Sequence, residues 1–318
     1  MLLLAVWTAC TIAALLYAQQ YNIPAATAWA VLPAFLLEAT FFCALADDRI
    51  RKRIEQLTSV IAAGALTVAA VAPYVFATLA LHTFNFQSFL LLAILGAVAS
   101  FWYVVVPKRP LSDVLFLAFM GAVMLLHVFP KIYVSPIPKL PISPLGQAMW
   151  VRTGVFVMLA VRGVSGVDFG FWPSRKQWQI GTLYYFLFLI VAVGVAWKIG
   201  FATPHFPPGG WQRASLLAVG TFLGVLWVLA LGEEFFFRGL LQQWIGSWTR
   251  SEIAGLILTS ILFGSVHLWF RAFPNWRFAL LAAIAGLFYG QAFRQTRSIR
   301  TSMVTHALVV TTWRVFFW

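Results

Sequence analysis

The chain contains eleven apolar stretches close to or above ~18 residues, and these constrain its fold more than any other feature. Charged residues make up only 10% of the chain, whereas a soluble domain carries roughly a quarter. Backbone polar groups inside a bilayer must bond within the protein, which favours helices. We therefore predict an all-α, polytopic transmembrane helix bundle. The expected spans are approximately 2–19, 27–46, 57–80, 88–106, 111–129, 146–162, 181–200, 215–243, 253–270, 277–293 and 299–318.

Lysine and arginine are spread unevenly over the loops between these spans. If the loop with Arg49, Arg51 and Arg53 is cytoplasmic, thirteen basic residues lie on that side and six on the other. The positive-inside rule then predicts a cytoplasmic N-terminus. The net charge of +13 is thus an orientation signal that favours anionic lipid head groups, and we expect no nucleic-acid partner. The first apolar run has no basic flank or cleavage pattern, so it reads as a span and not a signal peptide.

The spans fall into three parts along the chain. Residues 1–130 are an apolar transmembrane module of unknown role, 131–180 are a Pro- and Trp-rich connection with one span, and 181–318 carry most intramembrane polar residues. Glu38 in the first part is expected to pair or to snorkel to the membrane surface. Arg152 is expected to be a helix-end or packing cation.

The two cysteines and three of the histidines are expected to have structural and not catalytic roles. Cys10 and Cys43 lie in predicted spans and are expected to be buried small residues, not a disulfide or a zinc site. His82, His127 and His205 fall near span ends, where interfacial or structural roles are expected.

Two adjacent glutamates, Glu233 and Glu234, lie in the apolar eighth span. A carboxylate near the middle of a membrane helix costs ~2.5–3.5 kcal/mol, so such residues usually face a cavity and have a function. Arg238 follows Glu234 by four residues, and the two can pair on one helix face. Glu233 lies ~100° around the helix and is left for another role.

Two later spans each carry a histidine, His267 and His306, and Phe263 precedes the first by one turn. Three helices can bring Glu233 and both imidazoles together only inside a bundle. Such a set supports two chemistries. The glutamate can activate a water while a histidine stabilises the oxyanion, or the three side chains can bind zinc with an open position for water.

These residues resemble the motifs of a known family. GEEFFFRG (residues 232–239) resembles the EExxxR motif of the CPBP intramembrane proteases, which include CAAX prenyl endopeptidases and bacteriocin-processing and immunity-type proteins. FGSVH (263–267) resembles the FxxxH motif, and His306 the histidine of HxxxN or HxxxD. The Gly286–Gly290 pair resembles a close-packed family helix. The resemblance covers about residues 166–318.

The resemblance implies roles for these residues. Glu233 would activate the water, Glu234 and Arg238 would form a supporting pair, and His267 and His306 would complete the site. The sequence departs from the family at Val310, where an asparagine or aspartate is expected. Thr311, Thr312 and Arg314 are possible substitutes, but none of the three sits at the same helical position. Beside His267, we expect the substitute donor to be Thr311 or an ordered water.

The leading hypothesis is an intramembrane endopeptidase that cleaves a transmembrane or lipidated protein substrate. A glutamate mechanism is favoured over zinc because two histidines without a clear third ligand make a poor zinc site. We expect residence in a bacterial inner membrane and processing of a C-terminal sorting signal. Two alternatives stay open: a non-catalytic immunity or scaffold protein on the same fold, and a proton-coupled transporter. The substrate, the cleavage site and the oligomeric state are not given by the sequence.

Overall fold

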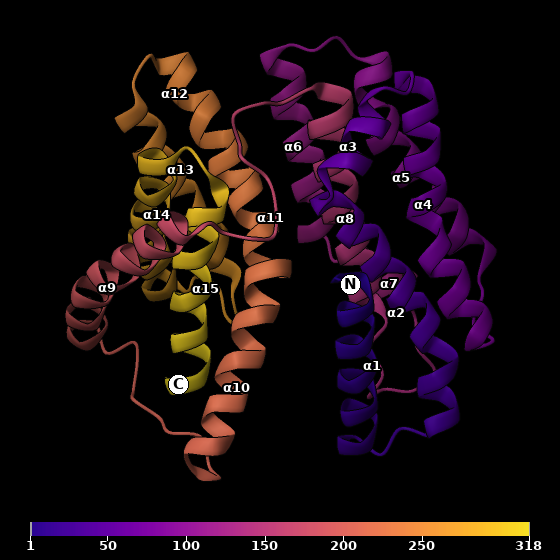
Figure 1. The fold of residues 1–318 in the computed structure, drawn as a ribbon, viewed down its shortest axis with the longest axis horizontal. Helices are drawn as coiled ribbons and strands as arrows, with labels where there is room; N and C mark the ends of the chain where they lie inside the picture. The colour runs from indigo at the N-terminus through magenta and orange to yellow at the C-terminus, as the bar shows by residue number, and fades with distance from the viewer. Residues whose placement is uncertain (1, 318) are drawn as a thin grey trace. The chain divides into compact units, whose positions relative to one another are not determined.

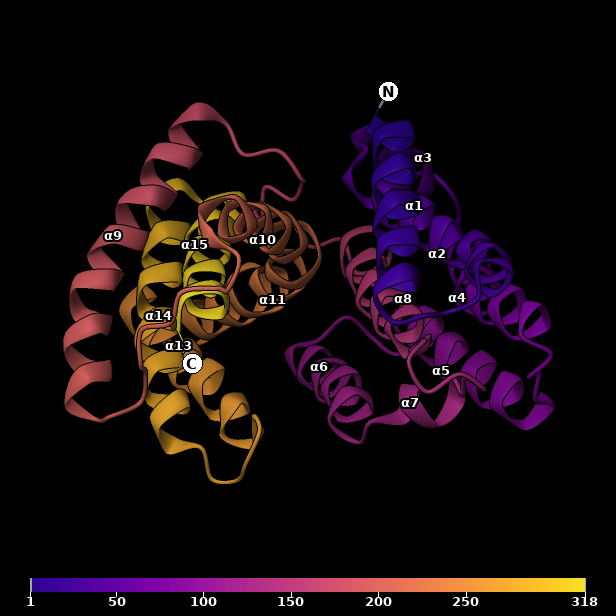
Figure 2. The same ribbon diagram turned by 90° about the horizontal axis from the view of Figure 1, so that it is seen from below.

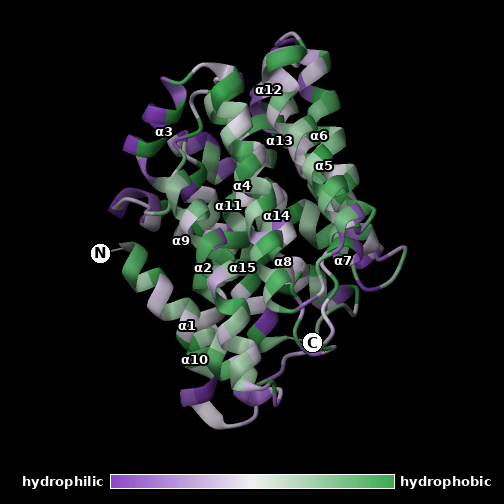
Figure 3. Ribbon diagram, turned by 90° about the vertical axis from the view of Figure 1, so that its right-hand side faces the viewer, coloured by the Kyte–Doolittle hydropathy of each residue, from purple (hydrophilic) through white to green (hydrophobic). Residues whose placement is uncertain are grey.

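A computed structural model describes residues 2–317, and all regular elements within them are helices. The chain forms two compact units, Met1–Val164 and Ser165–Trp318. Their boundary falls inside the predicted connection 131–180. Nine helical segments of the described residues are long and apolar enough to cross a membrane. The all-α polytopic bundle is thus confirmed, and Figure 3 shows the apolar residues that cover its long helices.

The first unit holds eight α-helices and one π-helical turn (Figure 1). They are α1 (Leu2–Gln20), α2 (Ala25–Ala46), α3 (Asp48–Glu55), α4 (Ser59–Ala80), α5 (Phe86–Val105), α6 (Pro110–Leu125), α7 (Val128–Ile132), α8 (Ser143–Phe156) and η1 (Val157–Arg162). The predicted fifth span corresponds to α6, which is apolar but has 16 residues, fewer than a bilayer crossing needs.

Buried ion pairs tie the helices of the first unit together. Arg152 donates to both carboxylate oxygens of Glu38, at 2.8 and 3.2 Å, and the two side chains are almost fully buried. Glu38 therefore pairs, as expected, but Arg152 is an interior cation and not a helix-end one. Arg162 makes a similar two-point contact with Asp113, at 2.8 and 2.9 Å. A buried charge needs such a partner because the apolar interior cannot solvate it.

The second unit consists of α9, a long interrupted helix and three further helices (Figures 1 and 2). The elements are α9 (Arg175–Lys198), α10 (Gly210–Gly224), η2 (Val225–Ala230), α11 (Leu231–Glu234), η3 (Phe235–Gln242), α12 (Gln243–Thr249), α13 (Glu252–Val266), η4 (His267–Trp269), α14 (Trp276–Thr296) and α15 (Ile299–Phe316). α15 packs against α9, α10 and α14, so it lies inside this unit. It is long enough for a span but is too polar to be among the nine.

Helices α9, α13, α14 and α15 of the second unit begin at side chains that cap them. Ser174 and Gln177 form a reciprocal capping box at the start of α9. Ser251 accepts from the N–H of Ala254 at the start of α13, and Asn275 caps α14 in the same way. Each cap satisfies an N–H group that the first helical turn leaves without a partner.

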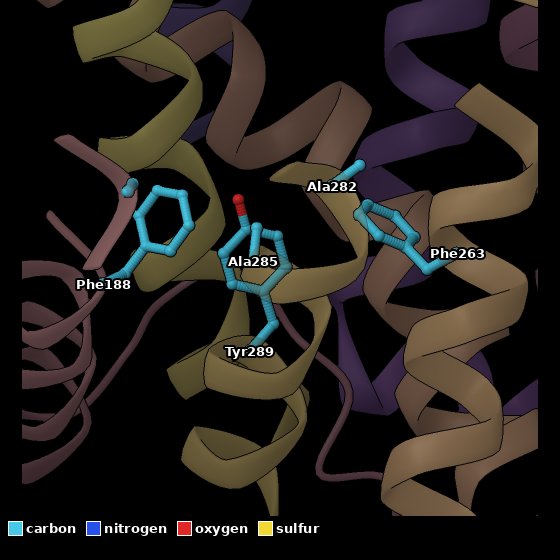
Figure 4. Packing of buried hydrophobic residues seen from close by; sticks show 6 residues of the cluster. Phe188, Phe263, Ala282, Ala285 and Tyr289 are labelled. Carbon is cyan, nitrogen blue, oxygen red and sulfur yellow. The ribbon is translucent and has the colours of Figure 1, made fainter. Parts of the chain in front are cut away.

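Helices α13 and α14 approach closely because small residues line their contact. A side chain at Gly264 would meet the carbonyl oxygen of Ala279 at 2.6 Å, and one at Gly286 would meet the Cα atom of Ser260 at 3.1 Å. An apolar cluster of α9, α13 and α14 lies next to this contact, and Figure 4 shows its buried members. The cluster consists of Phe188, Ala192, Phe263, Ala282, Ala285 and Tyr289.

Candidate functional site

The two glutamates lie on a short α-helical turn between two π-helical segments. α11 has four residues and ends with Glu233 and Glu234, while η2 precedes it and η3 follows it. Together with α10 and α12 they form one continuous helical segment of 40 residues, Gly210–Thr249. π-Helical turns are rare in proteins and occur frequently at functional sites, because they rotate the side chains that follow them.

Glu234 is the fully buried member of the pair. Its Oε1 lies 2.7 Å from Nδ1 of His306, and its Oε2 lies 3.3 Å from Nε of Arg238. The predicted pairing of Glu234 with Arg238 is therefore present. The second partner comes from α15, 72 residues further along the chain. Glu234 thus connects a cation on its own helix with an imidazole on another.

Arg238 lies in an aromatic environment and is fully buried. Its guanidinium carbon lies 4.5 Å from the ring centroid of Phe263 and 5.2 Å from that of Tyr289. Nη2 also donates to the carbonyl oxygen of Gly286 at 3.2 Å. Ring faces attract a cation through their quadrupole, and this attraction is strong where water is absent. Arg238 therefore joins η3 to α13 and α14.

Glu233 differs from its neighbour in exposure. Its side chain is 30% exposed, against 0% for Glu234. Its Oε2 lies 3.8 Å from Nε2 of His306, which is too far for a direct hydrogen bond. His306 thus faces Glu234 with one ring nitrogen and Glu233 with the other. Glu233 is the carboxylate that a water or a substrate can reach.

His267 lies directly after α13, at the first position of η4. Its Nδ1 lies 2.7 Å from the carbonyl oxygen of Phe263. A carbonyl oxygen can only accept, so Nδ1 carries a hydrogen and Nε2 presents a lone pair in the neutral ring. The Phe263 ring contacts both imidazoles, with centroids 4.8 Å from His267 and 5.9 Å from His306. Phe263 thus separates and orients the two histidines.

Tyr289 is a member of this site that the sequence reasoning missed. Its ring stacks on His306 with a centroid distance of 4.6 Å and an interplanar angle of 15°. It lies between Gly286 and Gly290, whose spacing indicates only close helix packing. An aromatic residue flanked by such glycines could have signalled a close contact with another helix.

Val310 lies on α15, after His306, at the position where the resembled family has a polar residue. Val310 is half-buried, and its neighbour Val309 packs against the apolar cluster. Thr311 is buried, and its hydroxyl has no hydrogen-bond partner. Thr312 instead bonds the hydroxyl of Tyr185 at 2.7 Å. Arg314 is exposed and lines a separate pocket, so it is not part of the glutamate–histidine cluster.

The predicted alternative zinc set does not fit this arrangement. Among residues 2–317, no three side chains of histidine, cysteine, aspartate or glutamate are grouped to hold a metal ion. Glu233, His267 and His306 are among the side chains that form no such group. These three side chains therefore do not form a metal site as they stand in the structure.

The second unit encloses carboxylates, imidazoles and a guanidinium among apolar helices. Residues 214–312 match the family model of type II CAAX prenyl endopeptidase Rce1-like proteins. The match confirms the resemblance to the CPBP family and includes Glu233, His267 and His306. At the family level it indicates a CAAX-type intramembrane protease with a membrane-associated protein substrate. No curated protein and no solved structure matches the chain.

Proposed function

We propose that this protein is an intramembrane endopeptidase in which Glu233 activates the attacking water. The single observation that carries the proposal is the difference between the adjacent glutamates. Glu234 is buried and occupied by two partners, whereas Glu233 is partly exposed and faces Nε2 of His306. A general base must reach both the water and the substrate, and Glu233 is the carboxylate of the pair that meets this condition.

The charges of the cluster suggest where the catalytic proton resides. Glu233, Glu234 and Arg238 together carry a formal charge of minus one, which an apolar interior disfavours. One proton, held by either Glu233 or His306, cancels this charge. Glu234 would stabilise the imidazolium that forms when His306 holds the proton. Glu233 and His306 then act as a base and an acid at one place.

The reaction follows from this proton. Glu233 removes a proton from the water as its oxygen bonds to the carbonyl carbon of the substrate. The oxyanion receives a hydrogen bond from Nε2–H of protonated His306, and from His267 when His267 is protonated. The C–N bond then breaks, and the proton held by Glu233 passes to the leaving amine nitrogen. Carboxylic acid and amine products result, without any change of oxidation state.

Val310 favours a second candidate, a non-catalytic scaffold or immunity protein on the same fold. The family's amide or carboxyl group is replaced there by an aliphatic side chain. Loss of one oxyanion donor typically costs ~10²–10³ in rate. The unpartnered hydroxyl of Thr311 supports the catalytic candidate, because it is a buried donor on the same helix.

The experiment is a comparison of membrane proteins from cells that carry the native chain or Glu233→Gln. Mass spectrometry should find at least one membrane protein that is shortened with the native chain and intact with the variant. Glu55→Gln is the matched control, because Glu55 is exposed and lies in the other unit. An identical set of cleaved proteins in all three strains would contradict the protease proposal.

A further inference from the structure

A second polar site lies at the end of the second unit where α15 ends and α10 begins. It is a pocket of about 310 Å³, formed by α10, the 199–209 loop, the turn after η4 and the last turns of α15. Its lining includes the side chains of Arg271 and Arg314 together with Leu217, Pro207 and Trp313. The pocket therefore combines two guanidinium groups with apolar walls.

The backbone holds this pocket in shape. The N–H of His205 donates to the carbonyl oxygen of Phe316 at 2.7 Å, and Pro204 forms an antiparallel bridge with Phe317. The 199–209 loop is thereby attached to the end of α15. Phe201 also stacks on Trp313 at a centroid distance of 4.9 Å. Two segments more than 100 residues apart in sequence thus form one wall of the pocket, and backbone and ring contacts hold them together.

Arg271 and Arg314 have no acidic partner among the residues that the structure describes. Residues 199–232 and 253–318, which include every lining residue, contain no aspartate or glutamate. The guanidinium carbon of Arg271 lies 5.4 Å from the ring centroid of Phe270. Two unneutralised guanidinium groups in one pocket raise the local positive potential. They therefore favour the binding of an anionic ligand that is not part of the protein.

The surroundings of the pocket indicate the kind of anion. Large aromatic side chains are exposed at this end of the unit, where α9 ends, α10 begins, η4 ends and α14 begins. They are Trp197 at 80%, Trp211 at 75%, Trp269 at 62% and Trp276 at 53% exposure. Exposed tryptophans of membrane proteins gather at the level of the lipid head groups. The pocket therefore lies at the depth of lipid phosphates.

We propose that this pocket binds the phosphate group of an anionic membrane lipid. Arg271 and Arg314 would hold the phosphate oxygens, since guanidinium groups match them in geometry. Leu217, Pro207 and Trp313 would contact the adjoining glycerol and acyl carbons. A zwitterionic lipid is disfavoured because its choline cation would lie near two arginines. The site is independent of the peptidase reaction.

The test is native mass spectrometry of the purified full chain, released from mixed micelles that contain phosphatidylglycerol and phosphatidylcholine. The native protein should retain phosphatidylglycerol, and the double variant Arg271→Gln, Arg314→Gln should bind it more than about tenfold more weakly. Arg277→Gln is the matched control, because it removes one charge at the same end from a residue outside the pocket lining. Arg314→Lys should retain more lipid than Arg314→Gln.

Several outcomes overturn the proposal. Equal lipid retention by the native protein and the double variant would do so, as would equal retention of both lipids. Displacement of the lipid by inorganic phosphate, or by a peptide with a free C-terminal carboxylate, at millimolar concentration would replace the lipid assignment. Thermal unfolding of each variant in neutral detergent shows whether it is folded. If the double variant is unfolded, lipid retention by the single variant Arg314→Gln tests the proposal. Because Arg314 is exposed, this substitution should leave the fold intact.

Discussion

Nδ1 of His306 lies 2.7 Å from Oε1 of Glu234, and this contact organises the candidate site. The carboxylate fixes the imidazole so that its opposite nitrogen faces Glu233, 3.8 Å away. Each of the two neighbouring glutamates thus acts on the same histidine from a different side, with a different degree of burial.

The two glutamates should respond differently to the same substitution. Glu234→Gln should destabilise the protein by about 3–5 kcal/mol, because it leaves the buried Arg238 without its countercharge. Glu233→Gln should leave the amount of folded protein unchanged and remove cleavage. Thermal unfolding in detergent, together with cleavage of a membrane substrate, measures both effects. Full cleavage by Glu233→Gln would rule out Glu233 as the base.

The Val310 position tests whether the site has another donor. Val310→Asn should change the cleavage rate by less than about tenfold, whereas His267→Ala should abolish cleavage, because a single oxyanion donor contributes ~10²–10³. Rates are compared on one purified membrane substrate. If Val310→Asn creates cleavage where the native chain has none, the native protein is a pseudoenzyme and the scaffold candidate is right.

Metal removal distinguishes a glutamate mechanism from a zinc mechanism. With a glutamate mechanism, a purified active sample should contain far less than one zinc ion per chain, and cleavage should survive long dialysis against a strong chelator. Elemental analysis alongside the cleavage assay measures this. Stoichiometric zinc that rises and falls with activity would instead make Glu233, His267 and His306 ligands.

The contact between α13 and α14 makes a prediction about stability. Gly264→Ala should destabilise the protein by ~1–3 kcal/mol, since the new carbon would meet the backbone oxygen of Ala279 at 2.6 Å. Gly220→Ala on α10 is the control, because nothing lies within 4 Å of its added carbon and alanine favours helices. The difference between their unfolding temperatures is the measurement. Equal temperatures would contradict the close packing of these helices.

The long apolar stretches allowed the helical fold to be predicted from sequence. Each predicted span coincides with a helix or a run of helices, although within residues 2–317 nine segments and not eleven are long and apolar enough to cross a membrane. The pairing of Glu234 with Arg238 was predictable for the same local reason, since a spacing of four residues places both on one helix face. Helix periodicity fixes such relations within one element.

The partners that come from distant elements were not predictable. The sequence presented Glu38 and Arg152 as separate charges, but they form a buried pair 114 positions apart. Nothing local in the sequence marks Tyr289 as a site residue, yet its ring stacks on His306. Neither contact leaves a periodic signal, because each depends on how two helices cross.

The sequence by itself determined that this protein is a helical membrane bundle, and it identified the glutamates and histidines of the candidate site. The tertiary structure decided which glutamate is buried, which nitrogen of His306 faces which carboxylate, and that Arg271 and Arg314 line one pocket. Hydropathy and helical spacing are local properties that any segment carries with it. Burial and orientation depend on packing between segments distant in the chain, and they exist only once the helices have assembled.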